Sequence, residues 1–511
     1  MENKSQMVVY PNRFLLVLLF LVFSTTSQFD NGHAQTISDW SAPERITGYA
    51  DDTEPPYLIA DQNRTVHAFT SQWVGDDNQK KAIIYNQWTM DRGWTPPVDV
   101  LLSPLKSAAR LLGAFLDSAG RMHVIFFGGD NTQANIYYAK APAVGAGNAS
   151  AWSSPVLVGK EALNPENGAL LGDDEGNLVI LFSGKQNGNG LYAVYSTDYG
   201  DTWSDPEPIF LTQDEQLFPF DTKMDLGQSG VLHVVWSNYD ISGNGVAVYY
   251  ADYDIGRKQW SNPLKLTSAR SGLSTVIEYD ERVIVIYNDY STNAFWMRES
   301  SDNSRSWTNP VRVAPRHIGR NGFVSLTIDS SNVLHLFFGQ RVPASTTIPD
   351  IHGMWHSTWQ GLAWSEPEAV VSGPGVNDPI GEGSFDPYNA RAVVSQGNVL
   401  LVAWQTDPGL NGNGIWYSFT NLAAPELPVA AFAPEPSISN STPTQTILSP
   451  TYTPINSPEP SPAGSNIVLS TSQTNAPVQN TLMAQIAVGI IPVVFLVSAA
   501  FIYKMYHRYR P

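Results

Sequence analysis

Short apolar runs rich in β-branched and aromatic residues recur from residue 40 to residue 421, and polar turns separate them. No segment of this region keeps apolar residues at helical spacing, so a βαβ organisation is not expected. Seven of the runs form a series, and hairpin-type turns such as Asp117–Gly120 precede them. The runs are Val66–Phe69, Met122–Phe126, Leu178–Phe182, Leu232–Trp236, Val283–Tyr287, Leu334–Phe338 and Val399–Trp404. The pattern predicts an all-β fold.

A second motif, Trp-Ser/Thr-x-Pro, also occurs seven times, with gaps of 54, 58, 51, 57, 47 and 57 residues. Its copies begin at Trp40, Trp94, Trp152, Trp203, Trp260, Trp307 and Trp364. A repeat of this length indicates stacked supersecondary units that bury their apolar faces against one another. Four short antiparallel strands in each unit are typical of a β-propeller blade. We therefore predict a β-propeller of seven four-stranded blades, with six blades as the alternative.

The order of the motifs predicts how the ring closes. The last unit, residues 389–421, has three strands but no Trp-x-x-Pro, whereas the motif at Trp40 precedes any complete unit. We expect the strand Trp40–Ile46 to complete the final blade. Such closure removes the exposed strand edges that an open array would present for aggregation.

Both ends of the chain carry segments of a different kind. The ten-residue apolar run Phe14–Phe23 follows Lys4 and Arg13, which predicts a secretory signal peptide within residues 1–35. A short uncleaved anchor is the alternative. Residues 483–503 are long and apolar enough for a transmembrane helix, and a short basic tail, residues 504–511, follows them. A removable sorting tail is the competing interpretation of this helix.

Between the propeller and the predicted helix lies a Pro/Ser/Thr-rich stretch, residues 422–482, which predicts a disordered stalk. The propeller itself is assigned residues 36–421. Together the segments predict a single-pass protein of the cell membrane with an extracellular propeller and a cytoplasmic C-terminus.

Charge and cysteine content exclude several classes of function. The formal net charge of −18 argues against a nucleic-acid partner, which requires a basic face. The chain has no cysteine, so disulfides and thiolate metal sites are excluded. No Gly-x-Ser-x-Gly, Walker or His-Glu-x-x-His motif is present, and we predict no cofactor and no metal.

One unit carries a more specific signature. Ser196, Asp198, Gly200 and Trp203 match the bacterial neuraminidase repeat, or Asp-box, and Ser300, Asp302 and Trp307 match it with Ser304 in place of glycine. The chain thus resembles the sialidase superfamily of BNR-repeat propellers over residues 36–421. In that family the boxes lie away from the catalytic face, so the resemblance implies a structural role. The Asp side chain can bond backbone amides of its hairpin, and the Trp can pack between strands.

The catalytic residues implied by the resemblance are not all present. Active sialidases open the first blade with an Arg in an Arg-Ile-Pro motif, where this chain has Glu54, and their propellers have six blades. A carboxylate at that position would repel the sugar carboxylate that the Arg binds. We therefore favour a propeller that binds an extracellular glycan or protein without catalysis. The alternative is an exo-α-sialidase-type glycoside hydrolase with a rearranged active site, and a third interpretation is a structural envelope module.

Candidate site residues lie in the loops that lead into the innermost strands. Arg110, Arg320 and Arg391 are candidates for a substitute carboxylate clamp, because guanidinium groups bind carboxylates bidentately. Asp52 and Glu54 are the catalytic candidates, as acid or base. Further ligand-binding candidates are Glu166, Asp221 and Asp386. Lys223 belongs to the same set of loop residues. The alternative is a solvated ring of mutually paired charges.

Two further patterns complete the set of candidates. His67, His123, His233 and His335 recur at one position of the repeat, so we expect hydrogen bonding within or between blades and no shared metal. Loops with exposed aromatic residues, such as the one at Trp73, could stack against sugar rings. The sequence does not identify the oligomeric state.

Overall fold

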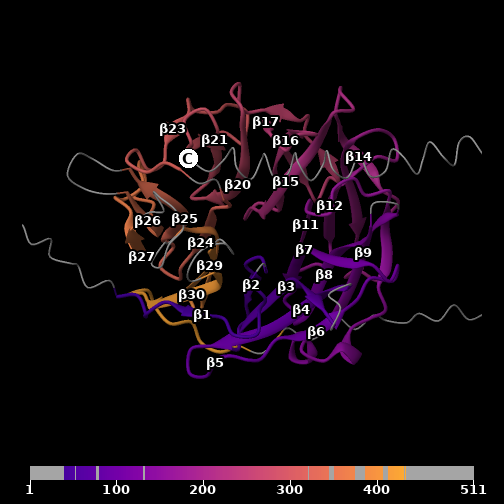
Figure 1. Ribbon diagram of the computed structural model, residues 1–511. Coiled ribbons are helices and arrows are strands. Elements are labelled where there is room, and N and C mark those ends of the chain that lie inside the picture. The colour runs from indigo at the N-terminus through magenta and orange to yellow at the C-terminus, as the bar shows by residue number, and fades with distance from the viewer. Residues whose placement is uncertain are drawn as a thin grey trace, which may run out of the picture. The chain divides into compact units, whose positions relative to one another are not determined.

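Seven antiparallel sheets stand side by side in a ring, with the first strand of each repeat nearest the axis (Figure 1). The computed structural model describes residues 39–51, 53–75, 80–130, 133–319, 322–343, 350–374, 386–406, 413–430 and 432. The prediction of an all-β, seven-bladed propeller is confirmed, and the alternative of six blades is wrong. Two sheets contain a short fifth strand.

The first four blades follow one another along the chain. Blade 1 contains β2 (Tyr57–Ala60), β3 (Val66–Val74), β4 (Lys80–Thr89), β5 (Gly93–Trp94) and β6 (Val98–Leu101). Blade 2 contains β7 (Ala108–Leu116), β8 (Arg121–Gly129), β9 (Ala134–Pro142) and β10 (Val156–Lys160). Blade 3 contains β11 (Gly168–Gly172), β12 (Leu178–Gly184), β13 (Gly190–Ser196) and β14 (Glu207–Leu211). Blade 4 contains β15 (Leu217–Leu226), β16 (Val231–Asp240), β17 (Gly245–Asp254), β18 (Gln259–Trp260) and β19 (Leu264–Lys265).

The last three blades use both ends of the described chain. Blade 5 contains β20 (Ser271–Tyr279), β21 (Arg282–Asp289), β22 (Ala294–Ser300) and β23 (Val311–Arg312). Blade 6 contains β24 (Ser325–Ile328), β25 (Leu334–Val342), β26 (Ile351–Thr358) and β27 (Glu368–Pro374). Blade 7 contains β28 (Pro387–Ser395), β29 (Val399–Thr406), β30 (Gly414–Asn421) and β1 (Glu44–Arg45), which pairs antiparallel with β30. Two 3₁₀ turns, η1 (Ala143–Gly145) and η2 (Ala149–Ala151), connect β9 to β10.

The hydroxyl of the Trp-Ser/Thr-x-Pro motif joins the outer segment to the third strand in every blade. At Ser204, for example, the backbone N–H donates to the Tyr195 carbonyl at 2.8 Å, and the Ser204 hydroxyl accepts from the Tyr195 N–H at 3.0 Å. The same two bonds are made by Ser41, Thr95, Ser153, Ser261, Thr308 and Ser365. Ser and Thr supply the oxygen that accepts this N–H, which an aliphatic side chain lacks, and all seven copies of the motif have Ser or Thr at this position.

The tryptophan of the motif packs against the preceding blade. Trp152 of blade 2 meets Phe69 of blade 1 edge-on at 5.8 Å between ring centroids, and Trp203 of blade 3 meets Tyr138 of blade 2 at 4.8 Å. Three more make the same edge-on contact: Trp40–Phe337, Trp94–Tyr417 and Trp307–Tyr250. The last two donate the indole N–H to the preceding blade, Trp260 to the Tyr195 hydroxyl and Trp364 to Met297 Sδ. The repeated tryptophan is therefore a wedge between blades, and it explains why the motif recurs once in each blade.

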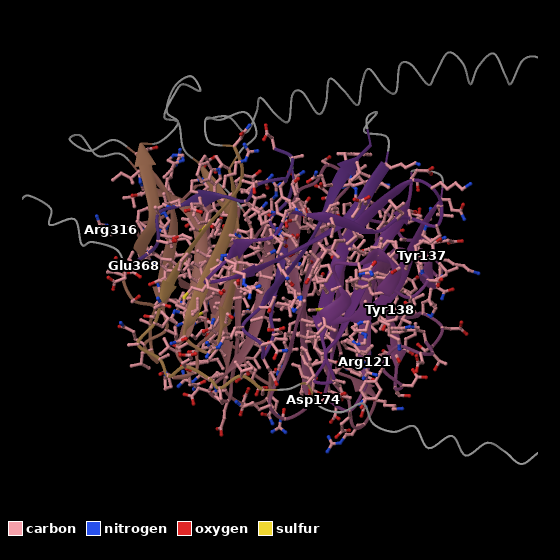
Figure 2. The ribbon with its side chains drawn as sticks, turned by 90° about the horizontal axis from the view of Figure 1, so that it is seen from below. Arg121, Tyr137, Tyr138, Asp174, Arg316 and Glu368 are labelled. Atoms are coloured by element: carbon pink, nitrogen blue, oxygen red, sulfur yellow. The ribbon has the colours of Figure 1, made fainter. Side chains whose placement is uncertain are left out.

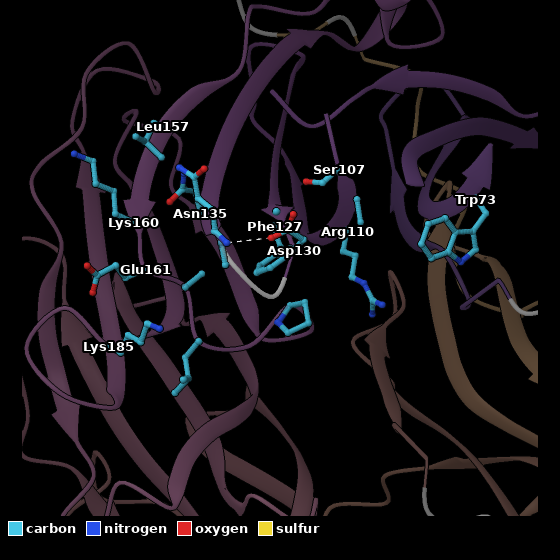
Figure 3. A pocket seen from close by; sticks show the side chains of 17 residues that line it. Trp73, Ser107, Arg110, Phe127, Asp130, Asn135, Leu157, Lys160, Glu161 and Lys185 are labelled. Carbon is cyan, nitrogen blue, oxygen red and sulfur yellow. Dashed lines mark hydrogen bonds between the residues drawn. The ribbon is translucent and has the colours of Figure 1, made fainter. Parts of the chain in front are cut away.

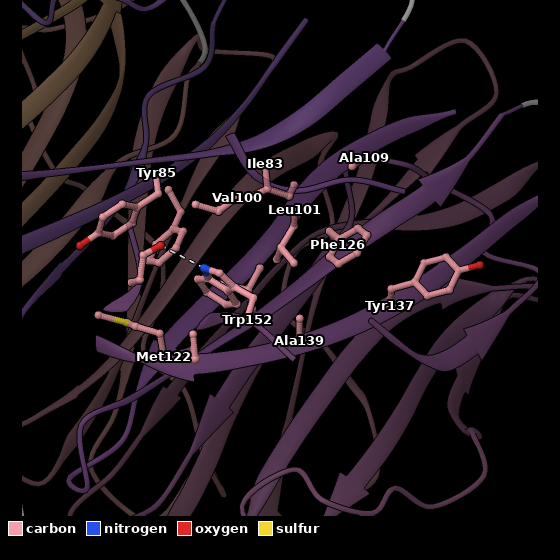
Figure 4. Packing of buried hydrophobic residues seen from close by; sticks show 14 of the residues in the cluster. Ile83, Tyr85, Val100, Leu101, Ala109, Met122, Phe126, Tyr137, Ala139 and Trp152 are labelled. Carbon is pink, nitrogen blue, oxygen red and sulfur yellow. Dashed lines mark hydrogen bonds between the residues drawn. The ribbon is translucent and has the colours of Figure 1, made fainter. Parts of the chain in front are cut away.

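Most of the hydrophobic core lies between neighbouring sheets. One cluster joins Phe69, Ile83 and Tyr85 of blade 1 to Met122 and Phe126 of blade 2 (Figure 4). These side chains come from the second and third strands, whose residues are almost continuously buried because each sheet is covered on both faces. Burial of apolar surface between blades is thus the main force that assembles the ring.

The in-strand histidines make the hydrogen bonds expected of them. His123 bonds the Tyr138 hydroxyl through Nδ1 at 2.6 Å and Asp117 through Nε2 at 3.2 Å. Tyr138 and Arg121, which also binds Asp117 at 2.7 Å, lie on adjacent strands of blade 2 (Figure 2). His67, His233 and His335 have equivalent partners: Tyr85 and Asp61, Tyr250 and Glu278, and His356 and Asp329.

The first residues of the predicted stalk lie against the propeller. The Leu427 N–H donates to the Gln396 carbonyl of blade 7 at 2.7 Å, and the Ala430 N–H donates to the Gln62 carbonyl of blade 1 at 3.3 Å. Phe432 packs on Gly120 of blade 2, where an added Cβ would come within 2.5 Å of the phenyl ring. This strap, residues 422–432 as far as they are described, crosses the face opposite the loops that lead into the innermost strands.

Nothing in the described part of the chain has the length and apolar character of a membrane-spanning helix. The predicted signal peptide (1–35), the remainder of the stalk, the predicted transmembrane helix (483–503) and the basic tail (504–511) lie outside the described residues.

Candidate functional site

Four blades contribute side chains to a cluster at the axis, which we call the axial cluster: Tyr57, Lys223, Phe323 and Arg391. The Arg391 guanidinium carbon lies 4.7 Å from the centroid of the Tyr57 ring and 5.4 Å from that of Phe323. The Lys223 Nζ lies 4.6 Å from the same Phe323 ring. All four residues are partly exposed, so a ligand can reach them. Two cations therefore share one aromatic ring.

The two cations of the axial cluster lie close enough to repel each other, and no carboxylate of the described residues contacts either of them directly. Burial lowers the pKa of the Lys223 ammonium, and the nearby positive charge of Arg391 lowers it further, to about 8. Asp221 and Glu54 act in the opposite direction but do not restore the ordinary pKa of lysine. Among the described residues, neither Lys223 nor Arg391 forms a salt bridge within 4.0 Å. An anion placed between the two cations would relieve their repulsion.

Tyr57 is held in a way that does not suit a nucleophile. Its hydroxyl donates a hydrogen bond to the backbone carbonyl of Leu112 in blade 2 at 2.8 Å. Burial raises the pKa of the phenol, and the charge of Arg391 only partly opposes this. An activated phenol would instead donate to a carboxylate or another base, as nucleophilic catalysis requires.

Asp221 lies between two blades. It occupies a left-handed backbone conformation (φ 56°) at a bulge of β15, is 2% exposed, and accepts the Leu273 N–H of blade 5 at 3.2 Å. Asn167 and Asn389 play the same part: Asn167 accepts the Thr222 N–H at 2.8 Å, and Asn389 accepts the Phe323 N–H at 3.0 Å. Burial raises the pKa of the Asp221 carboxyl to about 6, although Lys223 opposes the shift. Each of these three side chains thus hydrogen-bonds the innermost part of one blade to that of a neighbouring blade.

The remaining predicted candidates are dispersed around the ring. Arg110 and Glu166 form an ion pair at 2.8 Å between blades 2 and 3, and Asp386 bonds His352 Nδ1 at 3.1 Å between blades 6 and 7. Arg110 contacts Glu166, whereas Arg391 contacts Tyr57 and Phe323, so these two arginines share no partner among the described contacts. Glu54 precedes β2 near the axial cluster. Asp52 and Arg320 lie outside the described residues.

A groove opens beside Arg110, with a volume of about 770 Å³ (Figure 3). Trp73 and Arg110 lie on one side of it, and Lys160, Glu161 and Lys185 lie on the other. Its lining comes from blades 1, 2 and 3. We call it the blade 2 groove.

The residues that match the neuraminidase repeat form turns at the edge of the ring. Asp198 accepts the Thr202 N–H at 2.9 Å, and the Ser196 hydroxyl accepts the Gly200 N–H at 2.9 Å. In the second copy, Asp302 accepts the Ser306 N–H at 2.9 Å and bonds the Ser300 hydroxyl at the same distance. Trp203 and Trp307 are two of the wedges between blades, so the contacts of these residues are local and structural.

Sequence reasoning placed Lys223 in the ring of polar residues but did not name it as a ligand-binding candidate, and it assigned neither Tyr57 nor Phe323 to a site. The available signal for Lys223 was its place two residues after Asp221, a named candidate; both residues lie within β15. Tyr57 and Phe323 carried no signal, because an aromatic residue at a strand end is ordinarily part of the core. Within the described residues, no group of three or more His, Asp or Glu side chains is arranged to hold a metal ion.

No family model and no curated protein matches this sequence. Solved structures with a similar fold include a polysaccharide lyase, PL25 ulvan lyase, at 12% identity and a TM-score of 0.48, covering 73% of this chain and 95% of the lyase. The phage phi92 endosialidase matches at 10% identity and a TM-score of 0.47, covering 77% and 71%. The intramolecular trans-sialidase of Ruminococcus gnavus matches at 11% identity and a TM-score of 0.40, covering 74% and 96%. These likenesses describe the fold alone: the chain is a seven-bladed β-propeller whose solved neighbours include sialidases.

Proposed function

We propose that this propeller binds an acidic carbohydrate at the axial cluster and does not cleave it. The observation that carries the proposal is the pair of cations, Arg391 and Lys223, on the Phe323 ring. Two like charges at a partly buried position are costly unless an anion shares them. A sugar carboxylate or sulfate supplies that anion, and the rings of Tyr57 and Phe323 offer apolar faces to a pyranose ring.

The contacts of the described residues favour binding over hydrolysis. A glycosidase needs an acid and a second carboxylate or an activated nucleophile on either side of the scissile bond. In this propeller the Tyr57 hydroxyl donates a hydrogen bond to a backbone carbonyl, and Asp221 is buried between blades. Glu54 is the one described catalytic candidate left near the cations. A rearranged exo-α-sialidase site would have to pair Glu54 with a group such as Asp52.

The setting that we propose is the outer surface of a cell. It rests on the sequence of the terminal segments: a signal peptide, a Pro/Ser/Thr-rich stalk and an apolar helix with a basic flank. An extracellular glycan is then the accessible ligand. Surface biotinylation of intact cells, with the chain detected by an antibody against the propeller, tests this placement; labelling only after lysis would contradict it.

Two measurements on one preparation test binding against hydrolysis. We expect N-acetylneuraminic, galacturonic or glucuronic acid to bind in a calorimetric titration, and we expect no turnover of a fluorogenic sialoside above the rate without protein. Arg257→Met, on an exposed turn of blade 4, is the control for loss of one positive charge. Turnover that disappears in Glu54→Gln would establish the hydrolase instead.

A further inference from the structure

The blade 2 groove has the composition of a second carbohydrate site, separate from the axial cluster. We propose that it binds an internal stretch of an acidic oligosaccharide, with sugar rings against Trp73 and carboxylate or sulfate groups on Lys160 and Lys185. The inference extends the proposed function, because the same class of ligand is bound at a different place. The two proposals can fail separately, since their residues do not overlap.

Trp73 gives the groove an aromatic wall. The indole is 36% exposed, although the Lys81 Nζ lies over the ring at 6.0 Å from its centroid. Phe127 and the exposed Leu157 add apolar surface to the lining. An exposed indole at the wall of a polar groove is an arrangement suited to the apolar face of a sugar ring. Hydroxyl groups of the same sugar can donate to the carboxylates of Asp130 and Glu161, which also line the groove.

On the opposite side of the groove, two lysines lie with one carboxylate, Glu161, so the formal charge of this side is positive. Lys160 and Lys185 are exposed, and neither forms a salt bridge with another described residue. Arg110, the third cation of the lining, is already paired with Glu166. The chain as a whole is acidic, with a formal net charge of −18, so two lysines without a salt bridge in one groove differ from the rest of the protein. Such a pair favours an anionic substituent over a neutral one.

The size and span of the groove favour a chain over a single sugar. A volume of about 770 Å³ lies in the upper part of the range of small-molecule sites, which is roughly 300–1,000 Å³. Its walls come from three blades, with Trp73 on β3, Lys160 on β10 and Lys185 just after β12. A ligand that contacts Trp73 and both lysines must therefore extend across blade 2, as an oligosaccharide does.

Three hexasaccharides test this inference by calorimetric titration of the full chain in detergent: oligogalacturonate with carboxylates only, κ-carrageenan with sulfates only, and neutral cellohexaose. The groove variants are Lys160→Met/Lys185→Met and Trp73→Ala. The charge-matched control is Arg257→Met/Lys265→Met, which removes two exposed cations of blade 4. Arg391→Met/Lys223→Met reports on the axial cluster. Thermal unfolding of each variant verifies that it is folded.

We expect at least one acidic hexasaccharide to bind about tenfold or more tightly than cellohexaose. Lys160→Met/Lys185→Met should weaken that binding about five- to tenfold and reduce its dependence on salt, whereas the blade 4 control should not. Trp73→Ala should also weaken it. Whichever acidic hexasaccharide binds, oligogalacturonate or κ-carrageenan, shows whether the groove prefers carboxylate or sulfate groups. Wild-type affinity in the lysine variant, or equal binding of all three chains, would overturn the inference, even if the axial variant lost binding.

Discussion

The hydroxyl of Ser41 accepts a hydrogen bond at 3.0 Å from the backbone N–H of Phe419, 378 residues further along the chain. The bond is the same as the one that Ser204 makes within blade 3. The two ends of the described propeller therefore share a blade, and Ile46 strengthens the connection by donating its N–H to the Ile415 carbonyl at 2.8 Å. We propose that this pairing latches the ring.

The latch predicts that Ile46 contributes strongly to stability although it lies at the edge of a sheet. Its side chain is fully buried between blades 7 and 1, so Ile46→Ala should lower the free energy of unfolding by about 2–5 kcal/mol. Val156→Ala, at an exposed position of an outer strand, is the matched control and should cost less than about 0.5 kcal/mol. Denaturant unfolding measures both. Equal effects of the two substitutions would contradict the latch.

Replacing Asp221 with Asn should stabilise the propeller at neutral pH. Its folded-state pKa of about 6 lies above the unfolded value, so the folded protein carries a costly buried charge above pH 6. Asparagine keeps an oxygen for the Leu273 N–H and removes the charge. The free energy of unfolding should rise by on the order of 2 kcal/mol at pH 7, and the gain should vanish below about pH 4. A loss of stability at pH 7 would show that the ionised carboxylate is needed.

Replacing Asp117 with Asn should have the opposite sign. Burial alone would raise the pKa of this carboxyl, but hydrogen bonds from His123 and Arg121 lower it to about 2. Its contribution to stability is therefore present above about pH 4 and is lost as the pH falls through 2. Asp117→Asn should cost on the order of 2 kcal/mol at pH 7 and little at pH 2. Thermal unfolding from pH 2 to 8 measures the difference, and a cost that does not depend on pH would contradict the explanation.

Ligand binding at the axial cluster should weaken at alkaline pH. Lys223 binds an anion only while it is protonated, and its pKa of about 8 places the loss of charge near that pH. The affinity for an acidic monosaccharide should therefore fall as the pH rises from 7 to 9. Lys223→Arg, which keeps its charge, should bind equally at both values. A wild-type affinity that stays constant to pH 9 would remove Lys223 from the site.

The fold could be predicted because each motif residue has one structural task in every blade. The tryptophan packs on the preceding blade, and the Ser or Thr hydroxyl accepts an N–H of the third strand. Because the same contacts recur in every blade, the same residue types recur in the sequence, and the repeat can be recognised without a structure. The histidines of the second strands are a further case, since three of the four bond a Tyr hydroxyl and a carboxylate.

The site could be predicted only in part, because its residues do not repeat. Arg391 was named, but its partners Tyr57 and Phe323 come from the neighbouring blades 1 and 6 and lie far from it in the sequence. A bulge in β15 also decides which side chain faces the axis: Asp221 turns toward blade 5, whereas Lys223 reaches Phe323. Such a bulge shifts the alternation of side chains by one residue, and the sequence does not mark it. Lys160 and Lys185 of the blade 2 groove lie at or just after the end of a strand, and no sequence motif marks them.

The decisive measurement is the affinity of Arg391→Met for the acidic monosaccharide that the wild-type protein binds. Arg391 contacts both aromatic rings of the axial cluster and shares the Phe323 ring with Lys223, so its loss removes one of the two positive charges there. We predict binding at least about tenfold weaker than in the wild type and in Arg257→Met, with an unchanged melting temperature. Binding of wild-type strength in Arg391→Met would contradict the proposal that the axial cations hold the ligand.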